Sequence, residues 1–591
     1  MFVHEFRRLI LYFRRHQLVH PTTRVALTTF LIGLAGTTSV VFGSDEFDPP
    51  ASYYSAATGT GATLKSQLTS AMSAGHIERS YGDFRSSAAI HDRDPNNASR
   101  ILLVYNLASV SSTWDSGSTW NREHVWPQSR QPGSASNSTR GNLGDPHALR
   151  PCNPSINSSR GNKPFGNVSS TGGFGSQGTF YFPGDTDKGD ISRSLFYSAT
   201  RYASSGLVLV NGVPSGNQMG DLASLMAWHY LDTPGTFERH RNHAIFSQTL
   251  NPGYRTNNRN AYVDHPEFAW SVYMDQMNDT TLYFGDLEPA DGTSTIDLDI
   301  SALVGSTIDP MSFTLNKAGD DGTYYRVDAS AGLTSSVSGC YNAFPMNMAG
   351  VNQPIDLGFD ASITASAGQY LGDLTVDNLD VTTMGGAGNG NNDVNDIIFV
   401  EVNVYEPGQG SFDGGSDLNT LNLDLGTINL GTGDASQAYS FFNIAAGGSF
   451  GAPIDVELIS STGDTGVLAT NFAQVDSLAN GSEAMFSASM SDAGTGTFSA
   501  TYTFRVYNDQ SLFPNEASIE DLQLVLSGMV EAGGCSIADL AEPFGTLNFF
   551  DVSAFLNLFA ANDLAADFTD DGVLNFFDVS AFLNAYGVGC P

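Results

Sequence analysis

Residues 291–533 consist of short runs in which apolar and polar residues alternate, separated by clusters of Gly, Asn, Asp and Ser. Ile296–Ile300 and Leu421–Leu425 are two of these runs. Alternation with a period of two places the apolar side chains on one face of a strand, and frequent turn signals between such strands are typical of β-sandwiches. Two blocks, 291–410 and 411–533, open and close on such strands with a spacing of about 115 residues. We therefore expect two all-β sandwich modules.

The preceding block, residues 44–290, has a different pattern. Helical periodicity at 62–74 and 191–202 alternates with loops that contain Trp and His. This mixture predicts an α+β domain, in a chain whose 591 residues are enough for several domains. The chain as a whole is therefore expected to be multidomain.

The charges are distributed very unevenly along the chain. Residues 291–591 hold three basic and 39 acidic residues, whereas residues 121–201 hold nine basic and five acidic ones. The formal net charge of -36 therefore comes from the C-terminal half. Because like charges repel, a polyanion is expected to bind only near residues 121–201.

Residues 1–43 have the pattern of a signal peptide. Five Arg and one Glu accompany a mostly apolar run from Val25 to Val41, and small residues follow at the end of the segment. The alternative is a membrane anchor, but the run is shorter than the roughly 20 apolar residues that a spanning helix needs. No later segment is apolar enough to span a bilayer. We expect a secreted, extracellular protein with no membrane span in the mature chain; attachment to the cell surface stays open.

The last block, residues 534–591, contains a direct repeat. The sequence LNFFDVSAFLN occurs at 547–557 and again at 574–584. A loop with Gly572 for a sharp turn precedes the second copy, and its oxygen-bearing residues have the spacing of Ca²⁺ ligands: Asp567, Thr569, Asp571, Asn575 and Asp578. This pattern resembles the duplicated calcium loops of dockerin modules. We therefore expect a small α-helical module with structural Ca²⁺ and a protein or surface partner.

Two features qualify that prediction. The first copy, from Asp539 to Gly545, has one extra residue and lacks the third ligand, so its site is expected to be weak or metal-free. The alternative for the second copy is a helical cap with solvated carboxylates, because Asp578 stands where an EF-hand has Glu. Cys535 and Cys590 bracket the module and could form a disulfide in an oxidising compartment, while the pairing of Cys152 and Cys340 stays open.

The chemistry-bearing motif is WNREHVWPQS at residues 120–129. Glu123 and His124 are adjacent, so on a strand their side chains point to opposite sides. They are therefore not a pair of ligands on one face. The pattern favours a division of labour, in which the carboxylate binds a hard cation and the imidazole handles a proton.

Three further blocks follow in order: GNLGDPHALRPCNPSINSSRGNKPFG at 141–166, KGDISRSLFY at 188–197 and NNRNAYVDHPE at 257–267. Together with the motif, they resemble the endonuclease I family of exported ββα-metal nucleases over most of residues 53–275. The resemblance implies that His124 is the general base and that Glu123 and Asn157 hold a single Mg²⁺.

The resemblance also implies cleavage that leaves 5′-phosphate ends. Arg150 and Arg160 are the expected phosphate clamps, because guanidinium groups match phosphate oxygens bidentately. Whether Arg140, Arg150 or Arg160 meets the transition state is left open by the spacing. Asp145 and His147 are equally compatible with a structural role.

The sequence thus predicts a secreted, Mg²⁺-dependent endonuclease of low sequence specificity, whose substrate is DNA, with RNA left open. No helix-turn-helix, zinc-finger or RNA-recognition signature is present. The alternative is an acidic extracellular adhesion or structural protein with a non-catalytic, nuclease-like binding domain. The residues Glu123, His124 and Asn157 favour the enzyme.

Overall fold

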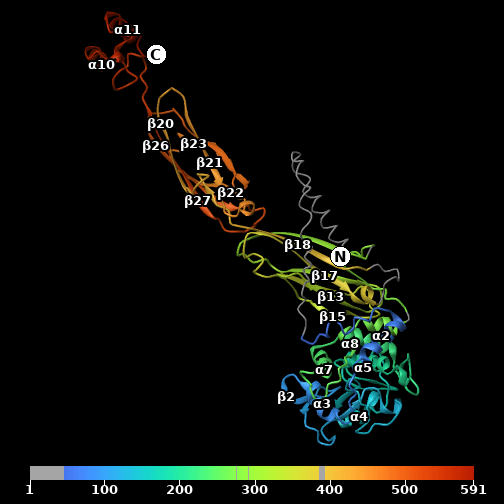
Figure 1. Cartoon of the computed structure of the whole chain (residues 1–591). Coiled ribbons are helices and arrows are strands. Elements are labelled where there is room, and N and C mark those ends of the chain that lie inside the picture. The colour runs from blue at the N-terminus through green and yellow to red at the C-terminus, as the bar shows by residue number, and fades with distance from the viewer. Residues whose placement is uncertain (1–45, 275, 291, 385–392, 591) are drawn as a thin grey trace, which may run out of the picture. The chain divides into compact units, whose positions relative to one another are not determined.

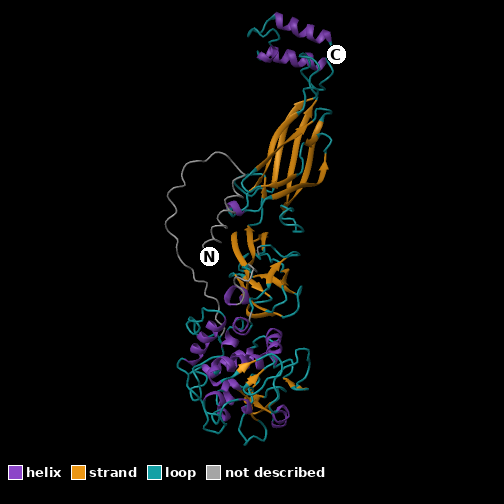
Figure 2. Cartoon of the chain, turned by 90° about the vertical axis from the view of Figure 1, so that its right-hand side faces the viewer, coloured by secondary structure: helices purple, strands orange, loops and turns teal. Residues whose placement is uncertain are grey.

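The computed structural model describes residues 46–274, 276–290, 292–384 and 393–590. The predicted signal peptide lies outside the described residues. Figure 1 follows the chain from a mixed helical and stranded region through strand-rich modules to a helical C-terminal module, and Figure 2 separates these by secondary structure. The α+β domain followed by β-sandwich-like sheets confirms the predicted fold class in its main features.

The N-terminal domain packs helices around short two- and three-stranded sheets. The helices predicted at 62–74 and 191–202 are present, with slightly different ends, as α2 and α5. The helices of the domain are α2 (Gly61–Ser73), α3 (Phe84–His91), α4 (Pro154–Arg160), α5 (Lys188–Arg201), α6 (Leu222–Leu231), α7 (Thr236–Phe246), α8 (Ala261–Asp264) and α9 (Phe268–Tyr273). The strands are β1 (Arg93–Asp94), β2 (Asn97–Leu102), β3 (Ser109–Ser111), β4 (Asn121–His124), β5 (Leu149–Cys152), β6 (Gly175–Gln177), β7 (Phe180–Phe182), β8 (Val208–Leu209) and β9 (Gln218–Met219).

The first sandwich contains a four-stranded and a five-stranded sheet. In order across the sheets, its strands are β10 (Thr281–Phe284), β12 (Met311–Ala318), β16 (Asn352–Phe359) and β14 (Leu333–Ser335), then β11 (Thr295–Leu303), β18 (Asp396–Tyr405), β17 (Gly368–Asn378), β13 (Thr323–Ala329) and β15 (Gly339–Phe344). Because β10 pairs with β12, the first sandwich begins before the predicted boundary at residue 291.

The second sandwich repeats this strand order. Its strands are β19 (Gly410–Ser411), β21 (Ala435–Asn443), β25 (Glu483–Met490) and β23 (Leu468–Thr470), then β20 (Thr420–Asn429), β27 (Glu520–Glu531), β26 (Gly496–Asn508), β22 (Ile454–Gly463) and β24 (Val475–Leu478). In each module the first and last strands of the larger sheet pair in parallel. The weak sequence repeat therefore corresponds to a shared topology.

The apolar core of the N-terminal domain is not made by that domain alone. Tyr324 on β13 and Leu379, which follows β17, are buried in the same cluster as Trp228 and Trp270. The next residue on β13, Tyr325, is buried in the separate core of the first sandwich. Successive side chains of a strand point to opposite sides, so β13 contributes to two cores at once.

The C-terminal module contains two equivalent helices, α10 (Phe549–Ala560) and α11 (Phe576–Val588). Each begins with a capping box, formed by Asn548 with Asp551 and by Asn575 with Asp578. The equivalent rings of Phe555 and Phe582 stack with their centroids 4.1 Å apart. The repeated sequence therefore forms a repeated helix with a shared small core.

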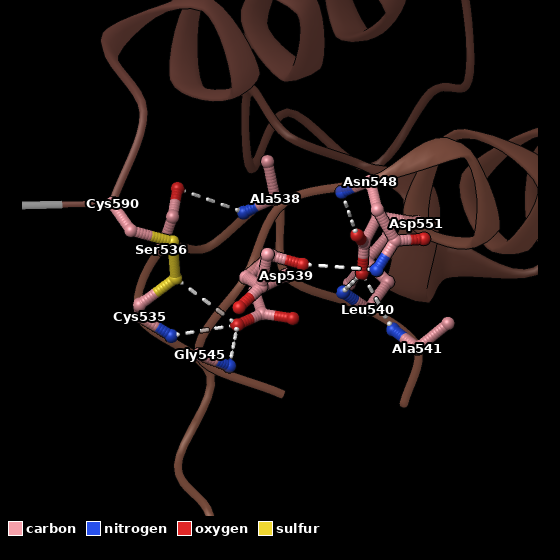
Figure 3. The surroundings of a disulfide bond; sticks show 11 residues. Cys535, Ser536, Ala538, Asp539, Leu540, Ala541, Gly545, Asn548, Asp551 and Cys590 are labelled. Atoms are coloured by element: carbon pink, nitrogen blue, oxygen red, sulfur yellow. Dashed lines mark hydrogen bonds between the residues drawn. A yellow bond between two sulfur atoms is a disulfide. The ribbon is translucent and has the colours of Figure 1, made fainter. Parts of the chain in front are cut away.

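The disulfide predicted between Cys535 and Cys590 is present, and Figure 3 shows its surroundings. Asp539 lies beside it and accepts hydrogen bonds from the backbone N–H groups of Cys535 and Gly545, at 2.9 and 2.5 Å. Because the two sulfur atoms are bonded to each other, the disulfide links the two ends of the module, and Cys535 and Cys590 offer no thiolate ligands for a metal. Cys152 is a buried thiol, and Cys340 packs against the N-terminal core.

Candidate active site

The predicted site residues lie on one small unit made of two strands and a helix. β4 pairs antiparallel with β5, with Glu123 opposite Arg150. The helix α4 follows at once, because the Asn153 side chain caps its first turn and Pro154 has the backbone angle that a helix start requires. Gly161 ends the helix at a φ of 60°. This order of elements is a ββα unit.

Glu123 is 1% exposed. Its Oε1 accepts a hydrogen bond of 2.8 Å from the Tyr105 hydroxyl and lies 3.2 Å from Nη1 of Arg160. Burial raises the pKa of Glu123, and the charge of Arg160 opposes that rise. Oε2 has no hydrogen-bond partner within the described residues, so one oxygen of this buried carboxylate is not used by protein donors.

Asn157 lies one turn before Arg160 on α4. Its Nδ2 donates a hydrogen bond of 2.8 Å to Oδ1 of Asn121 on β4. Asn121 and Glu123 are two residues apart on the same strand, so their side chains lie on the same side. The structure therefore brings Asn157 to the side of β4 on which Glu123 lies, with the amide oxygen of Asn157 not used in this bond.

His124 points to the other side of β4. Its ring stacks on Tyr81, with the centroids 4.9 Å apart and an angle of 21° between the planes. Nε2 lies 3.1 Å from the Leu143 carbonyl oxygen. A carbonyl only accepts, so Nε2 carries the proton in neutral His124, and Nδ1 keeps a lone pair. Burial lowers the pKa of His124 to about 4, which keeps the imidazole neutral at pH 7.

The two predicted phosphate clamps are both held by other groups of the protein. Arg160 is 1% exposed, and besides Glu123 it donates to the main-chain oxygens of His124 and Val125, at 3.1 and 2.7 Å. Arg150 is 4% exposed and lies 3.1 Å from Asp190 and 3.5 Å from Asp92. These contacts fasten α4 and β5 in place. A direct contact of either guanidinium with phosphate stays a prediction.

Three neighbours of the site were not predicted from the sequence: Tyr81, Tyr105 and Asn121. Tyr105 is buried at a φ of 75°, a rare conformation for a large side chain. Its backbone N–H donates 2.9 Å to Asp187 while its hydroxyl reaches Glu123. The segment around Tyr105 contains no motif, so only the tertiary structure reveals this contact.

Asp145 and His147 have internal partners. The Asp145 carboxylate accepts hydrogen bonds from the hydroxyls of Tyr197 and Tyr202, at 2.6 and 2.7 Å. Nε2 of His147 lies 3.3 Å from the main-chain oxygen of Asn258. Both residues therefore join distant segments of the domain.

In the C-terminal loop, some of the predicted Ca²⁺ ligands lie together. The Asp578 Oδ1 accepts from both the backbone N–H and the hydroxyl of Thr569, at 3.1 and 2.8 Å, and the Thr569 hydroxyl is 3.3 Å from Asp567. Asp571 instead accepts from the backbone N–H of Val573, and Asn575 caps α11. Asp567, Thr569 and Asp578 thus form the inner group of the loop.

Comparison with known proteins gives a consistent result for the N-terminal domain. The model of the family described as Endonuclease I matches residues 60–267. A protein named extracellular ribonuclease from Bacillus amyloliquefaciens is 34% identical over 241 residues, which are 37% of this chain and 78% of the relative. A protein of the same name from Bacillus subtilis is 34% identical over 234 residues, with the same coverage.

Among solved structures, a protein of unknown function from Porphyromonas gingivalis W83 aligns at 12% identity over 42% of this chain and 96% of its own length. The TM-score is 0.16, too low to indicate a shared fold.

Proposed function

Because the chain belongs to the endonuclease I family, whose members are phosphodiester hydrolases, we propose that its N-terminal domain cleaves both DNA and RNA with low sequence specificity. The observation that carries the proposal is the arrangement on β4. Oxygen atoms of Glu123 and Asn157 lie on one side, and a neutral His124 with a free lone pair lies on the other. This arrangement separates cation binding from proton transfer.

The family is metal-dependent, and the available donors fit a hard cation. One carboxylate oxygen and one amide oxygen are ligands that suit Mg²⁺, which keeps its remaining positions for water and phosphate. Glu123 is desolvated and only partly compensated by Arg160, so a bound cation would stabilise its ionised form. Bound at Glu123 and Asn157, a single Mg²⁺ would supply positive charge to the scissile phosphate and the departing 3′ oxygen.

His124 accepts the proton of the attacking water at Nδ1. The Leu143 carbonyl holds Nε2–H and so fixes the tautomer, while the stacked Tyr81 ring fixes the plane of the imidazole. The water oxygen bonds to phosphorus as the bond to the 3′ oxygen breaks, and the 3′ oxygen takes a proton from solvent, so the products are a 5′ phosphate and a 3′ hydroxyl. No step uses the 2′-hydroxyl, which is consistent with cleavage of DNA as well as RNA.

The setting of the enzyme is proposed to be extracellular. Two relatives carry the name extracellular ribonuclease, and the first 43 residues have the sequence pattern of a signal peptide. Within the part of the chain that the structure describes, no helix has the length and apolar character needed to cross a bilayer.

The test is cleavage of supercoiled plasmid and of a structureless RNA by the full chain with Mg²⁺ or with EDTA. We expect both substrates to be cut only with Mg²⁺, and the new ends to be 5′ phosphates. Failure of the wild-type chain to cut either substrate with Mg²⁺ or Mn²⁺ would instead favour the acidic extracellular scaffold with a non-catalytic binding domain.

We also propose that the loop from Asp567 to Asp578 binds Ca²⁺ in a dockerin-like module that takes a protein or surface partner. The spacing of its oxygen ligands and the closeness of Asp567, Thr569 and Asp578 support this proposal. In the first copy, three backbone N–H groups bind the Asp551 carboxylate, and no third ligand is present. That copy is therefore proposed to be metal-free.

Replacing Asp571 by Asn should weaken Ca²⁺ binding by roughly tenfold or more, because affinity depends on the number of charged ligands. Asp570→Asn changes the neighbouring, non-ligand carboxylate and should leave the affinity unchanged. Calorimetric titration of the full chain with Ca²⁺ measures both. Absence of binding by the wild-type chain, or equal affinities for the two variants, would contradict the assignment.

A further inference from the structure

We propose that Arg122 is the side chain that binds the substrate phosphate next to His124. The inference rests on the proposed function, since it assigns a substrate contact to the same site. Arg122 lies within the WNREHVWPQS motif, but the phosphate clamps predicted from the sequence were Arg150 and Arg160. The chemistry it would recognise is the phosphodiester backbone that DNA and RNA share.

The first observation is its position. Arg122 and His124 are two residues apart on β4, so their side chains lie on the same side of the strand, opposite to Glu123. Both contact one ring. The Arg122 guanidinium carbon is 3.6 Å from the centroid of Tyr81, and the His124 ring stacks on Tyr81 as well. A phosphate bound by Arg122 would therefore lie close to the proposed base.

The second observation is that the guanidinium is held in one orientation. Its Nη1 donates a hydrogen bond of 2.6 Å to the main-chain oxygen of Tyr81, and the Trp114 ring lies 5.2 Å from the guanidinium carbon. Cation–π contacts of this kind fix the plane of an arginine. Nη1 is used by these protein acceptors and Nε is buried, so Nη2 is the nitrogen left for a phosphate oxygen. The side chain is half-buried, so part of it reaches solvent.

The third observation concerns charge. Arg150 is neutralised by Asp190 and Asp92, and Arg160 by Glu123. Within the described residues, Arg122 has no carboxylate partner, and its side-chain hydrogen-bond partners, Asn137 at 3.4 Å and Tyr81, are neutral groups. A partly buried guanidinium without a counter-ion binds a phosphate oxygen favourably, because a charge-assisted hydrogen bond compensates for its lost hydration.

The experiment measures binding of the full chain to a fluorescent single-stranded RNA and to a short DNA duplex in EDTA, so that no cleavage is needed. Arg122→Gln is expected to weaken binding of both about tenfold at low salt. It should also make the slope of log K against log[NaCl] shallower by about 0.7 to 0.9, the value for one lost phosphate contact. Arg122→Lys should keep the slope and lose only part of the affinity, because it retains the charge without the planar fork.

Arg100→Gln is the matched control. Arg100 is also a half-buried strand arginine of this domain, and its guanidinium bonds to Ser109. Its loss should leave the salt slope unchanged. Equal slopes for the wild type and Arg122→Gln would overturn the inference, and so would a slope change found for Arg140→Gln but not for Arg122→Gln.

Parallel cleavage assays separate this inference from the proposed function. Cleavage by the wild type together with unchanged binding by Arg122→Gln overturns the role of Arg122 and leaves the nuclease. Reduced binding by Arg122→Gln in a chain that never cleaves supports the phosphate contact and overturns the catalytic function.

Discussion

Replacing His124 by Ala is expected to lower kcat on plasmid DNA by about 10²–10⁴-fold, the usual contribution of a positioned general base. The Mg²⁺ concentration for half-maximal activity should change little, because His124 points away from the side of β4 that holds Glu123 and Asn157. Single-turnover cleavage at saturating Mg²⁺, followed by a Mg²⁺ titration, measures both quantities.

His147→Gln is the matched control for this prediction. His147 is also a buried histidine of the same domain, and burial lowers its pKa to about 4 as well. It contacts the main-chain oxygen of Asn258 and the ring of Tyr197, so its replacement should reduce stability and leave kcat nearly unchanged. A kcat for His124→Ala within threefold of the wild type would remove His124 from the mechanism, as the contribution of about 10² or more would be missing.

Replacing Tyr324 by Ala is expected to destabilise the nuclease domain by about 3–5 kcal/mol, although Tyr324 belongs to the first sandwich. Its side chain is fully buried in the nuclease core, and its hydroxyl donates a hydrogen bond of 2.5 Å to the main-chain oxygen of His229. The neighbouring Tyr230 hydroxyl in turn donates 2.8 Å to Asp380. The nuclease activity that remains after brief heating of the full chain should therefore decline at a lower temperature.

Tyr325→Ala provides the comparison. Tyr325 is the next residue on β13, is 3% exposed, and packs in the core of the sandwich itself. Tyr325→Ala should lower the stability of the sandwich. It should lower the temperature at which the nuclease is inactivated less than Tyr324→Ala does. If the two variants inactivate at the wild-type temperature, the two cores are independent, and residues 44–290 would suffice for a stable enzyme.

The strand pattern and the motif blocks predicted much of this molecule. Alternation in runs such as Ile296–Ile300 reports which face of a strand is buried, and that rule holds whatever the strand pairs with. The positions of Glu123 and His124 could be predicted in the same way. Neighbouring residues of a strand point to opposite sides whatever the rest of the fold is, so these two side chains lie on opposite sides of β4. The capping residues around Asn157 likewise act within one turn of helix.

Contacts between distant segments could not be predicted in this way. Arg150 and Arg160 have the residue type of a phosphate clamp, but the carboxylates that surround them come from other parts of the chain. Asp92 comes immediately before β1 in the sequence, far from Arg150, and Asp190 lies on α5. Nothing in the local pattern of either arginine reveals these partners.

The amino-acid sequence by itself determined the fold class of each block and the residue types that could carry the chemistry. Strand alternation, helix caps and the Glu-His pair are properties of residues that are close in the sequence. The tertiary structure decided which arginines are paired with carboxylates and which remain available to bind phosphate. It pairs Arg150 and Arg160 with carboxylates, leaves Arg122 beside Tyr81 without one among the residues that the structure describes, and inserts Tyr324 into a core that the sequence assigned to another domain. Burial and charge pairing depend on which distant segments meet, and that is fixed only when the chain has folded.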